Sequence, residues 1–245
     1  MKFVYSENLP IELVVTEEMN MNYRFHTHTS HYILCVVLNG CVNLKLKNKE
    51  INYYTNESFT IAPYVAHSIL LDKKSKLLSL CIGTQLFDEY TSDELVPIIE
   101  KFFYSFFSKS TFNPVMEMFI KLIRKTYQIN RSLDCEFDKY MYDISQDIIK
   151  APESIHSLDM LSKTLFISKY YFIRKFKSNI GLTPHQFILQ EKIRKAQCLL
   201  ISDISVVEVS NALGFYDQSH FNKCFKSMVG ISPSDFINSG VSVQQ

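Results

Sequence analysis

Apolar and polar side chains alternate along the first third of the chain, and this pattern predicts short β-strands. The run from His31 to Leu38 is almost continuously apolar and ends at Asn39-Gly40, a pair typical of tight hairpin turns. The next segment alternates apolar and polar residues, as a strand with one buried face requires. The strands predicted after the first run cover residues 41–47, 51–54, 58–62 and 77–82. This spacing predicts a small antiparallel barrel or sandwich.

From about Gln85 the apolar residues recur at helical spacing. Between Pro114 and Tyr127 they form one stripe, and Pro114 suits a first helical turn. Such a stripe either packs into the core of its own chain or pairs two helices in a dimer. Ala151-Pro152 ends the preceding helix pattern and is the expected linker. The expected domains are a sensor barrel over 1–84, a helical dimerisation segment over 85–151 and a helical domain over 152–245.

The last third of the chain contains one pattern written twice. Each copy has a short helix pattern, a turn, and a second helix pattern that starts after Ser168 or Asp217, residues whose side chains cap helix starts. Both copies close with Gly-x-(Thr/Ser)-Pro-x-x-Phe, beginning at Gly181 and at Gly230. This is the pattern of two helix-turn-helix motifs, at about 155–183 and 204–232, joined by a linker helix over residues 184–201.

A repeat of this kind can also serve a helical scaffold. Scaffolds of stacked repeats need at least about three copies to bury a continuous core, and this chain has two. The second helix of each copy sets an apolar face, with Phe172 and Phe176 or Phe221 and Phe225, against a basic and polar face. Two copies with basic outer faces favour DNA binding over the scaffold interpretation.

The second copy also carries the residues of a known family. It contains Ala212-Leu213-Gly214-Phe215, then Gln218-Ser219, Phe221, Phe225-Lys226 and the closing Gly230-x-Ser232-Pro233. Residues 154–238 therefore resemble the DNA-binding domain of the AraC/XylS family of bacterial transcription regulators. The chain departs from the family pattern at Ser162, Ser210 and Lys192. The resemblance implies double-stranded DNA as partner, a homodimer, and transcriptional activation through RNA polymerase.

Candidate DNA contacts lie on the second helix of each motif, the helix that enters the major groove in this class of motif. The candidates are Lys169, Tyr170, Ile173, Arg174 and Lys177 in the first copy, and Gln218, Ser219, His220, Asn222 and Lys223 in the second. The resemblance places Tyr170 and Arg174 at the groove, where arginine can bind guanine with two hydrogen bonds. The expected phosphate contacts are Lys175, Lys177, Lys192, Arg194 and Lys226. The bound site should carry two short boxes about one helical turn of DNA apart.

Composition and charge narrow the class of protein. The 245 residues are 47% hydrophobic and 21% charged, an ordinary globular balance. Residues 152–245 hold 10 Lys and Arg against 7 Asp and Glu, whereas residues 1–151 hold 16 against 18. The excess of positive charge is small and by itself only hints at an anionic partner. No apolar run spans a membrane, no signal-peptide pattern opens the chain, and the six cysteines are scattered, so we expect a cytoplasmic protein.

The histidines of the first domain suggest a ligand site. His26 and His28 share one face of a strand, and Pro63-x-x-x-His67 can bring a third imidazole from a neighbouring strand. The stretch from Arg24 to Ile69 resembles the cupin-type effector domain of the same family. We therefore expect a pocket for a small-molecule effector. Its predicted lining is Arg24, His26, His28, Tyr32, Tyr64 and His67.

A divalent metal is the alternative for the same residues. His26, His28 and His67 would bind it, with His31 as a fourth ligand. Enzymatic cupins usually add a glutamate where this chain has Tyr32 or Ile33. Because that carboxylate is missing and the chain shows no catalytic constellation, we expect no cofactor and no enzyme. The sequence thus predicts an α+β transcription regulator controlled by a small molecule, with a metal-binding cupin fused to a DNA-binding domain as the alternative.

Overall fold

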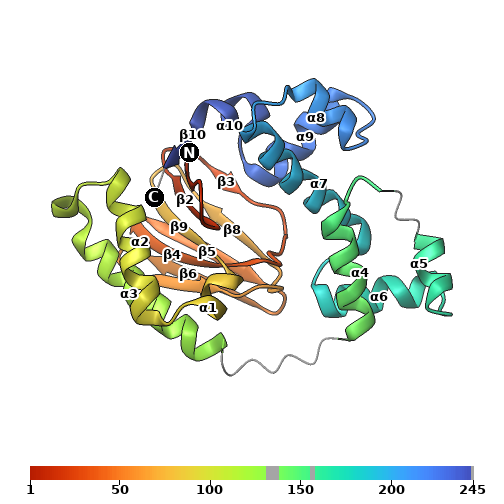
Figure 1. Ribbon diagram of the computed structural model, residues 1–245, viewed down its shortest axis with the longest axis horizontal. Coiled ribbons are helices and arrows are strands. Elements are labelled where there is room, and N and C mark those ends of the chain that lie inside the picture. Colours follow the sequence, from red (N-terminus) through yellow and green to blue (C-terminus); the bar gives the residue numbers. More distant parts are fainter. Residues whose placement is uncertain (131–137, 155–157, 244–245) are drawn as a thin grey trace.

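The computed structural model describes residues 1–130, 138–154 and 158–243, and it places a region of β-sheet beside a region of helices (Figure 1). The strands are β1 (Lys2–Ser6), β2 (Ile11–Thr16), β3 (Met21–Asn22), β4 (His31–Asn39), β5 (Cys41–Leu46), β6 (Lys49–Tyr54), β7 (Ser58–Ile61), β8 (His67–Leu71), β9 (Lys76–Gly83) and β10 (Gly240–Val243). The helices are α1 (Thr84–Glu89), α2 (Ser92–Phe106), α3 (Lys109–Asn130), α4 (Lys139–Lys150), α5 (Leu158–Thr164), α6 (Lys169–Ile180), α7 (Pro184–Ile201), α8 (Val206–Ala212), α9 (Gln218–Val229) and α10 (Pro233–Ser239). The predicted combination of an antiparallel β domain followed by a helical domain is confirmed.

The strands form two sheets. One has the order β10-β1-β2-β9-β4-β7 and the other β3-β8-β5-β6. All neighbouring strands run antiparallel except β1 and β10, which are parallel. Among the described strands none belongs to both sheets, so the sheets remain open and do not close into the predicted barrel. The parallel pairing of β10 with β1 ties the end of the helical domain to the start of the chain.

The long apolar run of β4 is explained by burial on both of its faces. Because successive side chains of a strand point to opposite faces, Ile33, Cys35 and Val37 pack between the two sheets. Tyr32 and Leu34 point the other way, into the core beneath the first three helices. Six of the strand's first seven residues are at most 6% exposed, which accounts for a run with hardly any polar position.

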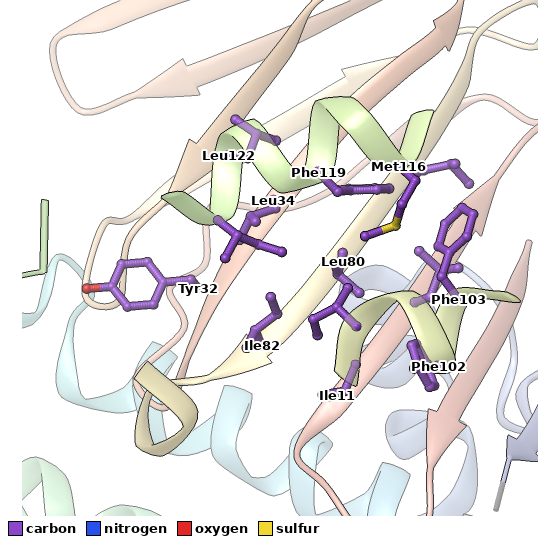
Figure 2. Packing of buried hydrophobic residues seen from close by; sticks show 14 of the residues in the cluster. Ile11, Tyr32, Leu34, Leu80, Ile82, Phe102, Phe103, Met116, Phe119 and Leu122 are labelled. Carbon is purple, nitrogen blue, oxygen red and sulfur yellow. The ribbon is translucent and has the colours of Figure 1, made fainter. Parts of the chain in front are cut away.

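Helices α2 and α3 cover the outer face of the larger sheet, and their apolar stripes supply its core (Figure 2). Phe119 and Ile123 are fully buried, and Leu122 is 6% exposed. The apolar stripe between Pro114 and Tyr127 therefore packs within its own chain. Of the two roles that the sequence left open for this stripe, core packing is the one that the structure shows. A charged residue at Leu122 would therefore disrupt the fold and could not serve as a test of dimerisation.

The second half of the structure is helical, with α4 packed against α6 and α7. The predicted linker helix is α7, with the bounds that the sequence indicated. The repeated Gly-x-(Thr/Ser)-Pro pattern has one structural cause in both copies. Gly181 and Gly230 end α6 and α9 at φ values of 86° and 97°, in the left-handed region that glycine adopts at low cost. Two residues later Thr183 and Ser232 cap the next helix, and proline fills its first turn.

Candidate DNA-binding surface and inter-domain pocket

The predicted contact residues of α6 lie mostly in solvent. The side chain of Ser168 caps the helix by accepting from the backbone of Tyr171, and Phe172 and Phe176 anchor its inner face in the core. Lys169, Tyr170, Arg174 and Lys177 are exposed, and Ile173 is partly buried. The Arg174 guanidinium lies 5.7 Å from the centre of the Tyr170 ring. This stacking holds arginine and tyrosine together on the outer face of the helix.

The corresponding surface of α9 is also open. Asp217 caps the helix by accepting from the backbone N–H of His220 at 2.6 Å. Gln218, Ser219, His220 and Lys223 are exposed. Asn222 is partly buried, and its Oδ1 is buried with no hydrogen-bond partner among the described residues. A carbonyl oxygen so placed faces the protein, which makes Asn222 a poorer candidate than its neighbours for reaching a base.

Two of the expected phosphate contacts are occupied by protein groups. Lys175 pairs with Asp138 at 2.6 Å, on the side of α6 that faces α4. Arg194 lies on the side of α7 that faces the sheets, where its Nη2 is 2.8 Å from Nδ1 of His31. The sequence interpretation of Arg194 as a phosphate contact is therefore wrong for this arrangement. The helical pattern of residues 184–201 could not show that α7 packs against the sheet domain as well as against the other helices.

A pocket lies between the sheets and α7. Its lining combines apolar side chains such as Ile33, Ile69 and Leu77 with polar ones from both halves of the chain. The polar and charged lining residues are Glu12, Thr16, Tyr23, Arg24, His26, Thr27, His28, His31, His67, Ser79, Gln190, Arg194 and Gln197. Apolar walls with a few convergent polar groups are typical of a small-molecule site.

Four of the six predicted effector residues line this pocket: Arg24, His26, His28 and His67. Tyr32 does not. It follows His31 on β4 and so points to the opposite face of the sheet, where its ring packs on Phe87 at 4.9 Å. Tyr64 lines a separate groove beside α6, and its hydroxyl accepts a hydrogen bond from Gln146 on α4. The prediction that Tyr32 and Tyr64 line the effector pocket is therefore wrong.

Three imidazoles meet at one side of the pocket. The backbones of His26 and His67 exchange two hydrogen bonds, of 2.9 and 2.8 Å, which sets their rings 4.3 Å apart. The ring of His28 lies 4.9 Å from that of His26 and 5.2 Å from that of His67. Burial lowers the pKa of His26 to about 4 and that of His67 to about 3, and it lowers the pKa of His28 well below its ordinary value. All three imidazoles are therefore neutral near pH 7.

The linker helix α7 is hydrogen-bonded to the segment that carries His26 and His28. Gln190 Oε1 accepts from the backbone N–H of Thr27 at 3.0 Å, and Gln190 Nε2 donates to the carbonyl of Thr27 at 2.6 Å. Gln190 and Thr27 are buried. Thr27 stands between His26 and His28, so a change at these histidines reaches α7 directly through two buried hydrogen bonds.

Glu12 places a titratable carboxyl in the pocket wall. Burial raises the pKa of Glu12 to about 7, and the nearby positive charge of Arg194 only partly offsets this effect. The sequence interpretation did not select Glu12 or Gln190. Glu12 alternates with buried Ile11 and Leu13 on β2 and therefore reads as a solvent-facing position of an amphipathic strand. Glu12 lines a pocket because the helical domain packs over this face of β2.

A helix-turn-helix domain family matches residues 161–239. The transcriptional regulator MtrA of Neisseria gonorrhoeae is 29% identical over 140 residues, which are 54% of this chain and 46% of MtrA. The chain thus matches less than half the length of this relative. No described helix is long and apolar enough to cross a membrane.

Solved structures show the same fold over nearly the whole chain. An apo ToxT variant from Vibrio cholerae has a TM-score of 0.64 at 14% identity, covering 96% of this chain and 99% of its own. ToxT bound to an unsaturated fatty acid has a TM-score of 0.57 at 14% identity, covering 93% and 95%. MtrA is named an HTH-type transcriptional regulator. At 14% identity the ToxT structures show a shared fold. The order of a two-sheet domain, a linker helix and two helix-turn-helix motifs is therefore an established architecture.

Proposed function

We propose that this chain is an AraC-type transcription regulator, and that it binds specific sequences of double-stranded DNA through its helix-turn-helix domain under the control of a small molecule. The DNA would contact α6 and α9, and the effector would occupy the pocket between the sheets and α7. The carrying observation is the pair of exposed second helices, each with basic and polar side chains on its outer face and phenylalanines beneath. A helix of this kind fits the major groove.

The pocket supports control by an effector because it is built from both halves of the chain. Its walls include Gln190 and Arg194 of α7, the helix that joins the two motifs. A ligand that binds one arrangement of α7 better than another shifts the chain toward that arrangement. ToxT, which has the same fold, binds an unsaturated fatty acid. This supports, for the present chain, an effector of small-molecule size.

Several finer properties belong to the same proposal. The protein acts in the cytoplasm, where its DNA is. It activates transcription by contacting RNA polymerase and works as a homodimer. The domain boundary falls near Ala151, although α4 packs with the helical half of the structure. The dimer surface must then lie outside the buried face of α3.

Enrichment of fragmented genomic DNA on the purified full-length protein tests the proposal. The wild type should enrich sites with two boxes about one helical turn apart. The double variant Arg174→Ala, Lys223→Ala should lose them, since both side chains are exposed on the second helices. Lys121→Ala, on the exposed face of α3, is the control for loss of positive charge and should enrich the same sites. Equal enrichment by the wild type and the double variant would refute these helices as the DNA-binding surface.

A further inference from the structure

The three histidines at the side of the pocket have the geometry of a metal site. Each of His26, His28 and His67 offers a ring nitrogen, and these three nitrogens all lie within 4.8 Å of one another. Ligand nitrogens of a tetrahedral zinc ion, with bonds of about 2.0–2.1 Å, are about 3.4 Å apart. Small rotations of the rings therefore bring all three nitrogens to bonding distance of one ion. The histidines come from β8 and from the segment before β4, which the backbone pairing of His26 with His67 holds together.

The hydrogen bonds of two of these rings fix which of their nitrogens keeps a free lone pair. Nδ1 of His26 lies 2.7 Å from the carbonyl oxygen of Arg24, and Nδ1 of His67 lies 2.8 Å from that of Val65. A carbonyl only accepts, so both Nδ1 atoms carry the proton and donate it. In a neutral imidazole the other nitrogen, Nε2, is then the unprotonated one. A backbone carbonyl that fixes the tautomer in this way is the usual outer contact of a metal-binding histidine.

Two of the three histidines have buried ring nitrogens without a hydrogen-bond partner among the described residues. His67 is fully buried, and its Nε2 has no hydrogen-bond partner in the described chain. Both ring nitrogens of His28 are also buried and have no hydrogen-bond partner among the described residues. Buried polar atoms are rarely left unpaired, because each costs free energy that a partner would recover. A metal ion would satisfy these nitrogens together.

His31, the predicted fourth ligand, has a different role in the structure. Its Nδ1 and Nε2 lie 2.8 and 3.2 Å from Nη2 of Arg194, which can only donate. The lone pair of His31 is therefore used by the linker helix. A three-histidine set leaves at least one coordination position of a metal ion free, and all three histidines line the pocket.

We propose that His26, His28 and His67 bind one divalent first-row transition metal ion, such as Zn²⁺, and that this ion is part of the effector site. Imidazole ligands without carboxylate suit zinc, iron, nickel and copper, and do not suit magnesium or calcium. The open positions would accept water or a donor group of a small molecule in the pocket.

The regulatory part of this inference rests on the proposed function. Ligation would fix the backbone on both sides of Thr27, whose N–H and carbonyl are held by Gln190 of α7. Metal binding should therefore change how α7 sits against the sheets, and with it the spacing of α6 and α9. Gln190 is a positioning residue in this scheme, because it touches neither the metal nor DNA.

Metal titration of the full-length protein tests the site. The wild type, freed of metal by a chelator, should bind one equivalent of Zn²⁺ by calorimetry and should give the visible absorption of four-coordinate Co²⁺. His28→Ala and His67→Ala should each weaken binding at least about 100-fold and abolish that absorption. His185→Ala, an exposed histidine on α7, is the matched control and should bind as the wild type does. Wild type that binds no more Co²⁺ than His28→Ala overturns the site.

The possibility that a variant fails to fold is covered by two further measurements. Far-ultraviolet circular dichroism identifies such a variant, and His28→Gln, which keeps a polar side chain of similar length, then replaces it. In addition, Zn²⁺ should raise the melting temperature of the wild type and of His185→Ala but not that of the cluster variants. The absence of a rise in the wild type at one hundred micromolar Zn²⁺ counts against the site.

The regulatory link is tested separately on a DNA fragment enriched by the wild type. Zn²⁺ should change the affinity of the wild type for this fragment at least about fivefold. Gln190→Leu should keep metal binding and lose most of that change. Metal binding without any DNA binding would refute the proposed function and leave the site standing. DNA binding without metal binding would refute the site and leave the proposed function standing.

Discussion

The two helix-turn-helix copies obey the same local rules but meet the sheets through different contacts. In both, a capped second helix ends at a glycine with positive φ, followed by a capped helix that begins with proline. At Gly181 the sheet domain approaches through Ala66, and an added Cβ would lie 2.6 Å from its Cβ. At Gly230 it approaches through the end of the flexible Met21 side chain. The repeated glycine therefore serves both the helix end and the contact between the domains.

The turns inside the two copies differ more. The second copy uses Gly214 at φ 65°, whereas the first uses Phe166 at φ 54° with its side chain 96% exposed. A left-handed conformation costs a residue with a Cβ about 1–2 kcal/mol. The second copy also has a capping box, in which Ser205 and Glu208 cap one another's backbone. The turn of the second copy is therefore the less strained of the two, while the first copy has α4 as an additional packing neighbour.

The linker helix belongs to neither copy, so a change beside it should act on the whole chain. Glu12→Gln removes the buried carboxyl that faces Arg194. The folded pKa of Glu12, about 7, lies above its ordinary value of 4.5, so the native state favours the protonated form. The wild type should therefore match the variant at low pH and lose stability relative to it as pH rises from about 4.5 to 7. The variant should be more stable by up to about 3 kcal/mol at pH 8.

Chemical unfolding of both proteins between pH 4.5 and pH 8 checks this prediction. Glu7→Gln, at an exposed position, is the control for the loss of one charge. Parallel stability curves for the wild type and Glu12→Gln would mean that Glu12 ionises equally in the folded and the unfolded chain.

Single DNA-contact variants ask whether both copies engage DNA. Arg174→Ala should weaken binding to an enriched fragment by roughly 1–3 kcal/mol and relax the sequence preference in one box only. Lys223→Ala should act on the other box, or, if it contacts phosphate, weaken all sequences evenly and reduce the salt slope by about 1. Fluorescence anisotropy on fragments with either box scrambled separates these effects. A normal affinity for Lys223→Ala would leave the other exposed residues of α9 to carry the second box.

Alanine substitutions at Gly181 and Gly230 test whether the two contacts with the sheet domain differ in rigidity. Gly181→Ala and Gly230→Ala should each lose about 1–2 kcal/mol of stability from positive φ alone. Gly181→Ala should lose more, because Ala66 cannot move away as the end of Met21 can. Gly240→Ala, at φ −82° with its nearest atom 3.7 Å from the added Cβ, is the control and should be nearly neutral. Thermal unfolding ranks the three, and equal losses at 181 and 230 would remove the distinction between the contacts.

The difference between local patterns and contacts between distant parts of the chain explains how much of the structure the sequence could predict. The repeat, the caps at Ser168 and Asp217 and the linker helix all follow from short-range patterns, and these elements are present. The pocket depends on which strand face meets α7, and that is fixed by contacts between Thr27 and Gln190, 163 residues apart. The sequence interpretation put Tyr32 in the same pocket as the histidines, yet its ring packs on Phe87 beneath the helices on the other face of the sheet. Local rules thus predicted the elements but not the partner of each face.

The turn residues give the smallest and most local test of the comparison. Gly214→Ala should lose about 1 kcal/mol, through backbone strain alone, since among the described residues only Lys192 Nζ comes within 4 Å of the added Cβ, at 3.7 Å. Phe166→Gly should relieve the same strain in the first copy, less the roughly 0.5–1 kcal/mol that glycine costs in the unfolded chain. We expect a net gain of about 0.5 kcal/mol, measured by urea unfolding. Because Phe166 is almost fully exposed, no packing should be lost; a clear loss of stability would show that its ring, and not its backbone, maintains the first copy.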